Sequence, residues 1–159
     1  MEEFITAVRE ILENATATGG TLEGAVLAEN ENNIPRKDII LVVHEVNETF
    51  LENVAFDYEI VTGKIMVTVL SRIKKGELTP WKKAMQTARQ WGKKVRQTLL
   101  QNSKLISSSY PDGVAIDEKY TKIPSIVYGY GTVDTAWFAF SRLEMETRYL
   151  YRAGTLAMQ

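Results

Sequence analysis

The sequence predicts an α+β fold, with a mostly antiparallel sheet on which an N-terminal helix and a long amphipathic helix pack. Apolar residues recur at helical spacing over residues 2–14 and again over 80–100, and runs of period-two alternation lie between and after these segments. The order helix, strands, helix, strands is typical of an α+β domain. The length of 159 residues fits a single domain over 1–151, followed by a C-terminal tail at 152–159.

The N-terminal part is predicted to form a helix and a short strand. The helix covers residues 2–14, because apolar side chains from Phe4 to Leu12 recur on one helix face. The Gly19-Gly20 pair is expected to break it. Leu22, Val26 and Leu27 are consistent with a short strand, and the polar residues that follow read as a loop.

Two further strands and a hairpin are expected before the second helix. The β-branched run at 39–43 predicts a buried strand. Residues 47–53 are expected to form a connection. Two alternating runs flank Thr62-Gly63, so residues 54–70 are predicted as a hairpin that turns at this dipeptide.

The longest helix is predicted to begin at Pro80, which suits the first helical position, with Thr79 as its cap. Lysines and arginines occupy most of its surface and are expected to point outward. The remaining stripe is apolar, and the tryptophans on it are expected to lie in the core. The stripe consists of Trp81, Ala84, Met85, Ala88, Trp91, Gly92, Val95 and Leu99.

The C-terminal part predicts a loop, a strand, a bend and a long closing strand. The loop is expected at 107–113, the strand at 123–128 and the bend at 129–131. Residues 136–151 alternate between apolar and charged side chains, which predicts a strand much longer than the common five or six residues. Its charged positions are Arg142, Glu144, Glu146 and Arg148.

The composition excludes several classes of protein. There is no cysteine, which excludes disulfides, thiolate zinc sites, iron–sulfur clusters and cysteine nucleophiles. Hydrophobic residues make up 45% and charged residues 25%, as in ordinary globular domains. The chain starts without a basic and apolar leader and has no run of 18 apolar residues. We therefore expect a soluble protein made in a cytoplasm, with no membrane partner.

The net charge of −1 conceals a strong segregation of charge along the chain. Residues 1–59 hold 13 acidic and 3 basic residues, a net charge of −10. Residues 72–104 hold 10 basic residues and the single acid Glu77, a net charge of +9. Such asymmetry indicates a surface for nucleic acid or for a charged partner, or two surfaces of opposite charge made for each other.

No combination of residues predicts catalysis. His44 is the only histidine, and it is interpreted as a strand histidine. An enzyme that uses it with the nearby Glu45, Glu48 and Glu52 is the weakest hypothesis, because these carboxylates lack the spacing of a metal or acid–base site. Nucleophile-elbow, P-loop and dinucleotide fingerprints do not occur. We expect no catalytic, metal-binding or cofactor-binding residues, and hence no enzyme.

The basic segment has three interpretations. It is a solvated helix face, a nucleic-acid-binding surface that tracks phosphates, or one half of a contact between subunits. The contact between subunits explains the near-neutral total charge, because the basic surface of one copy would meet the acidic surface of the next. The predicted interface residues are Lys74, Lys75, Lys82, Lys83, Arg89, Lys93, Lys94, Arg142, Glu144, Glu146 and Arg148.

The order of features resembles the tail terminator and tail-completion (neck) proteins of long-tailed bacteriophages. Four places carry the resemblance: the first helix at 2–14, the hairpin at 54–70 with KIMVTV, the helix at 81–100 with ARQWGKKVR, and the closing strand at 136–151. The insertion at 102–122 departs from the pattern.

The resemblance implies a structural virion protein that forms a ring, usually a homohexamer. Such a ring caps the tail tube, stops its growth and joins it to head connector or stopper proteins, and DNA passes through without sequence recognition. The resemblance also implies assembly in the host cytoplasm, location in the virion and a docking role for the tail at 152–159. The alternative is a nucleic-acid-binding domain that uses the basic helix at 80–104.

Overall fold

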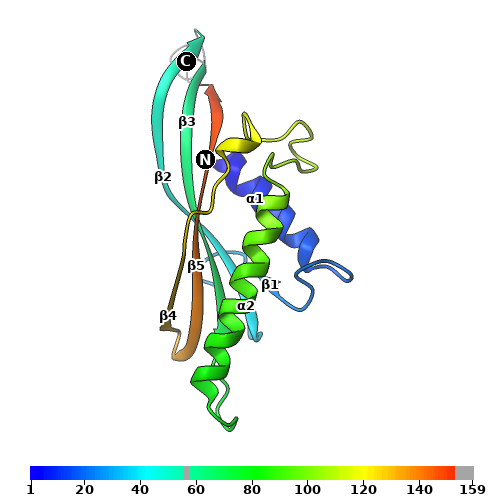
Figure 1. Cartoon of the computed structure of the whole chain (residues 1–159), viewed down its shortest axis with the longest axis vertical. Coiled ribbons are helices and arrows are strands. Elements are labelled where there is room, and N and C mark those ends of the chain that lie inside the picture. The colour runs from blue at the N-terminus through cyan, green and yellow to red at the C-terminus, as the bar shows by residue number, and fades with distance from the viewer. Residues whose placement is uncertain (56–57, 153–159) are drawn as a thin grey trace.

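Over the residues that the structure describes, the protein has an α+β fold in which two α-helices cover one face of a five-stranded sheet (Figure 1). These are residues 1–55 and 58–152 of a computed structural model, with the backbone alone at 52–55 and 152. The strand order is β1-β2-β3-β5-β4, and all neighbours are antiparallel except β1 and β2. The predicted fold class is confirmed. The elements are α1 (Glu2–Thr16), β1 (Val26–Leu27), β2 (Ile39–Ala55), β3 (Tyr58–Arg72), α2 (Pro80–Gln101), the 3₁₀-helix η1 (Glu118–Tyr120), β4 (Ile126–Val133) and β5 (Ala136–Arg152).

Strands β2 and β3 form one long antiparallel ribbon, which corrects two predictions. β2 continues through residues 47–53, which were expected to be a connection, and the turn predicted at 62–63 lies inside β3. Gly63 is required there because the ring of Tyr149 covers it, and a Cβ atom would lie 2.6 Å from Tyr149 Cε1. A glycine that makes room for a ring has the same sequence signature as a turn glycine, which is why the hairpin predicted at 54–70 is wrong.

The long closing strand predicted at 136–151 is confirmed as β5, which lies between β3 and β4. The bend predicted at 129–131 is wrong, because these residues form ladder pairs with β5 inside β4. Here too a glycine accommodates an aromatic ring, since a Cβ atom on Gly129 would lie 2.6 Å from Phe140 Cζ. β4 begins at Ile126, so only the end of the strand predicted at 123–128 is formed.

Helix α1 packs against the sheet through the face that the sequence predicts. Phe4, Val8 and Leu12 are fully buried, and the helix ends at Thr16, slightly beyond the predicted residue 14. The predicted short strand is reduced to the two residues of β1, and Leu22 is instead buried in the turn before it. The core thus lies between the helices and one face of the sheet.

Helix α2 packs on β5 and β3 and confirms the predicted long helix (Figure 1). Its start differs from the prediction: Thr79 has a left-handed backbone with φ of 53°, and its hydroxyl donates to Leu78 O instead of capping the helix. Trp81 is also not a core residue, because 43% of it is exposed. Its ring packs against Tyr130 of β4 and Trp137 of β5, which are themselves exposed, so these contacts leave it partly in solvent. The buried side of α2 consists of Ala84, Ala88, Gly92, Val95, Thr98 and Leu99.

The sheet face opposite the helices, here called the outer face, is only partly covered. Near the start of β2, Ile40 and Phe138 belong to a small apolar cluster with the connection that precedes β2. Farther along the sheet, His44, Met66 and Glu144 form a cross-strand row on this face. In the described part of the chain, no helix lies over this row.

The insertion at 102–122 packs against both layers. Its end extends the sheet beyond β4, because Lys122 pairs with Glu146 of β5. Its loop is attached to α1, where Glu10 accepts hydrogen bonds from the backbone and hydroxyl of Ser109. These bonds, the Ser109 hydroxyl first, lower the pKa of Glu10 to about 2.

Candidate interaction surfaces

The outward side of α2 is a basic face, as the sequence predicts. Lys82, Lys83, Arg89, Lys93 and Lys94 are all exposed. They point outward because they lie on the side of α2 away from its buried residues, which are mostly small and let the helix approach the sheet closely. Gly92 sets this approach, since a Cβ atom there would lie 2.7 Å from Ser141 Cβ of β5.

The cations of α2 have few partners within the chain. Arg89 lies over the ring of Tyr128 at 5.1 Å, and Lys94 lies over Trp91 at 4.6 Å. Among the described residues, none of the α2 cations forms an ion pair with a carboxylate. Their charge is therefore not neutralised by the acidic N-terminal region of the same molecule.

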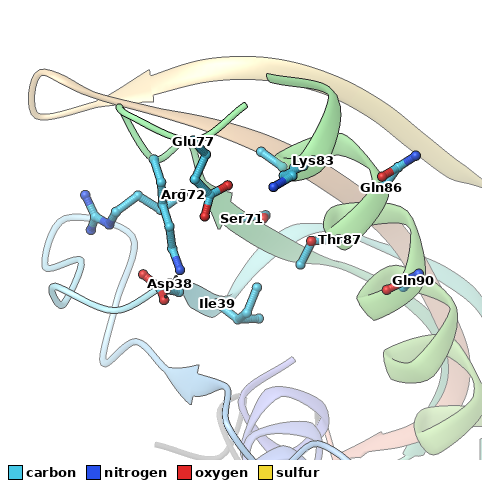
Figure 2. Close-up of a pocket in the computed structure, with 11 residues that line it drawn as sticks. Asp38, Ile39, Ser71, Arg72, Glu77, Lys83, Gln86, Thr87 and Gln90 are labelled. Atoms are coloured by element: carbon cyan, nitrogen blue, oxygen red, sulfur yellow. Dashed lines mark ion pairs between the residues drawn. The ribbon is translucent and has the colours of Figure 1, made fainter. Parts of the chain in front are cut away.

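Lys74 and Lys75 lie in the connection between β3 and α2, and Lys74 lines a cleft of about 400 Å³ (Figure 2). Lys74 Nζ lies 2.7 Å from Asp38 Oδ2, and this hydrogen bond raises the pKa of Lys74. The Lys74 and Asp38 side chains are both largely exposed to solvent, which screens their attraction, so the pair contributes little to the stability of the fold. Acidic and basic groups line the cleft together, with Asp38 and Glu77 opposite Lys83.

The four charged residues of β5 lie on the outer face of the sheet, on the other side from α2. Arg142 lies over the ring of Phe140 at 4.8 Å, and Arg148 lies over Tyr120 at 4.5 Å. Glu144 forms an ion pair with Lys64 of β3 at 3.4 Å. The structure thus divides the predicted interface residues into two groups on opposite sides of the sheet.

His44 and Glu48, one of the carboxylates that the weakest hypothesis pairs with it, lie on opposite faces of the sheet. His44 lies on the outer face, where its Nδ1 atom is buried without a hydrogen-bond partner among the described residues. Glu48 lies opposite Gly63 on the helix-covered face and forms an ion pair with the amino group of Met1 at 2.7 Å. No cluster of three or more histidine, aspartate or glutamate side chains occurs in the described ranges.

A group of exposed aromatic residues, which we name the aromatic corner, was not predicted from the sequence. It consists of Trp81 from the first turn of α2, Tyr130 from β4 and Trp137 from β5. The ring centroids lie 5.1 Å apart for Trp81 and Tyr130 and 5.3 Å apart for Trp81 and Trp137. Their exposed fractions are 43%, 44% and 48%. The one sequence feature that points to an exposed ring here is the position of Trp81 at the very start of the apolar stripe.

A second unpredicted surface, here called the β2 tip, extends along β2 from the middle of the strand into its distal half. It consists of Glu45, Val46, Phe50 and Leu51, all exposed. Phe50 contacts the ring of Tyr151 at 5.9 Å but remains 55% exposed. The connection predicted at 47–53 contains Phe50 and Leu51, which in the structure belong to β2, so the sequence does not indicate this surface.

No model of a known protein family matches the chain, and no curated protein is similar enough to count as a relative. Inference about function therefore starts from the surfaces described above.

Aromatic and basic side chains are prominent among the exposed residues of these surfaces. Exposed aromatic and basic side chains provide apolar contact area together with charge-assisted hydrogen bonds. In the part of the chain that is described, neither α-helix is long and apolar enough to cross a membrane.

Proposed function

We propose that the protein is a structural virion protein of a phage neck, whose copies form a ring that caps the tail tube and joins the tail to the head connector. The observation that carries the proposal is that the basic face of α2 is exposed without ion pairs among the described residues. The chain also contains the opposite charge, a net −10 over residues 1–59. The resemblance of the sequence to tail terminator and neck proteins supports the same conclusion.

The proposed mechanism is steric and electrostatic. A basic surface that meets an acidic surface on the next copy makes a heterologous contact, and repetition of that contact closes a ring when the rotation allows it. Surface ion pairs contribute about 0–1 kcal/mol each, so their main effect is on register and choice of partner. DNA would pass through such a ring without sequence recognition, and tail tube and connector or stopper proteins would bind its two ends.

Charge reversal on the basic face tests the proposal. Lys93→Glu with Lys94→Glu should weaken assembly measured by light scattering, while circular dichroism and the melting temperature stay as in the wild type. A matched control, Lys119→Glu with Lys122→Glu, changes the net charge equally at exposed positions outside α2. Equal assembly of the test variant and the wild type would contradict the proposed role of the basic face.

Nucleic-acid binding through α2 is the second candidate, because the same unpaired cations suit phosphates. Its test is a titration against DNA at several salt concentrations, where the affinity should fall steeply as salt rises. Absence of binding at low salt would exclude it.

A further inference from the structure

The aromatic corner is bordered by cations. Trp81, Tyr130, Lys82 and Arg89 line one depression of about 440 Å³. Trp81, Trp137 and Lys75 contribute to a second depression of about 360 Å³. The corner therefore combines large rings with positive charge on both sides of Trp81.

Side chains of this kind dominate the binding energy of protein interfaces. Tryptophan, tyrosine and arginine are enriched among interface residues whose truncation costs most of the affinity. Each ring of the corner leaves more than two fifths of its surface in contact with solvent. A partner that covers the three rings would remove this apolar area from water.

The β2 tip is also apolar, but it carries negative charge where the aromatic corner carries positive charge. It presents Val46, Phe50 and Leu51 with exposed fractions of 42%, 55% and 44%, together with the exposed carboxylate of Glu45. Glu59 on the neighbouring strand β3 adds a second, half-exposed carboxylate, whereas Glu48 is paired with the amino group of Met1. An apolar, negatively charged surface thus matches the apolar, positively charged corner.

The two surfaces cannot meet within one molecule. β2 and β4 lie on opposite sides of the central strands β3 and β5. The distal half of β2 lies at one end of the long axis, and the first turn of α2 lies at the other end (Figure 1). Two complementary patches at opposite ends of one molecule allow a heterologous contact, in which each copy binds the next in the same way.

We propose that the aromatic corner of one copy binds the β2 tip of the next copy, which makes this the repeated contact of the assembly. The inference rests on the self-assembly in the proposed function and names the two surfaces that meet. Side chains carry the contact, because register irregularities at Glu45/Asn47 and Phe50/Glu52 interrupt the edge of β2. Such bulges hinder pairing of a strand edge with another backbone.

A second copy explains the corner better than a nucleic acid does. Bases bind by stacking on the open faces of aromatic rings. In the corner, Tyr130 and Trp137 both pack against Trp81 at interplanar angles of 64° and 56°. This packing leaves no gap between parallel rings within the corner for a base.

Two variants that each destroy one surface test the proposal. The corner variant carries Trp81→Gln with Trp137→Thr, and the tip variant carries Phe50→Thr with Leu51→Thr. Each should self-associate more weakly than the wild type by roughly 30-fold or more. A control variant, Ile106→Thr with Ile116→Thr, replaces two exposed apolar residues elsewhere and should assemble like the wild type.

Mixing the two variants is the decisive step. The corner variant keeps an intact tip and the tip variant keeps an intact corner, so an equimolar mixture should form a one-to-one dimer by native mass spectrometry and stop there. Circular dichroism verifies folding, and Trp137→Thr alone replaces the corner variant if the double variant fails to fold. Folded variants that assemble like the wild type, or that stay monomeric when mixed, would overturn the proposal.

Other outcomes separate this inference from the proposed function. Wild-type rings that both variants still form would overturn the corner–tip contact and leave the ring intact. Wild-type filaments that both variants abolish would support the contact and contradict the closed ring. Loss of binding to a single-stranded oligonucleotide by the corner variant, with normal assembly, would reassign the corner to nucleic acid.

Discussion

Replacement of Gly63 by alanine tests whether this glycine is present because Tyr149 packs over it. The added Cβ atom would lie 2.6 Å from Tyr149 Cε1, 2.8 Å from its Oη and 3.1 Å from Phe4 Cδ2. Tyr149 and Phe4 are 2% and 0% exposed, so neither ring can move away without disturbing the core. Overpacking of this kind costs about 1–3 kcal/mol.

Gly131→Ala in β4 is the matched control for this substitution. A Cβ atom there would lie 3.8 Å from Phe140 Cε1, which is an ordinary contact. The control therefore measures the effect of replacing glycine by alanine in a strand when no clash occurs. For a chain of this size, about 1 kcal/mol shifts the melting temperature by about 2–4 °C. Gly63→Ala should therefore melt about 2–12 °C below Gly131→Ala by calorimetry. Equal melting temperatures would refute the packing explanation.

Two further predictions concern the contacts that position α2 and the insertion. Gly92→Ala should lower the melting temperature although alanine favours helix by about 1 kcal/mol, because the new Cβ would lie 2.7 Å from Ser141 Cβ. Adding Ser141→Gly should reduce the cost of Gly92→Ala, and an unchanged cost would contradict the close helix–sheet contact. The pKa of Glu10 is lowered from 4.5 to about 2, and the hydrogen bond from the Ser109 hydroxyl is the largest cause. The ionised carboxylate therefore stabilises the fold fully above about pH 4.5, and this stabilisation is lost as the pH falls toward 2. Glu10→Gln should therefore lose less stability than the wild type between pH 5 and about pH 3 in denaturant titrations, and an equal loss would show that Glu10 is not the titrating group.

The sequence predicts an element well where its hydrophobic period continues without interruption. The alternation through β5 predicts both its length and the side of the sheet on which Arg142 and Glu144 lie. The stripe of α2 likewise predicts which side carries Lys93 and Lys94. In these elements the spacing of the apolar residues decides which face is buried, and this spacing can be read from a single sequence.

The errors arise where tertiary packing determines the role of a residue. Gly63 and Gly129 accommodate rings from β5, and local sequence does not distinguish such glycines from turn glycines. Trp81 continues the apolar stripe, but the sheet residues that it meets, Tyr130 and Trp137, are themselves exposed. The aromatic corner joins three separate elements, so only the fold reveals it.

The central claim is that copies of this chain close into a ring through one repeated contact. The most direct measurement is electron microscopy of the purified protein at low salt, combined with the native mass of the particles. A closed ring of uniform mass, about six subunits by the resemblance to neck proteins, is the predicted result. A chain that remains monomeric, or that forms only open filaments, across all concentrations would contradict the claim.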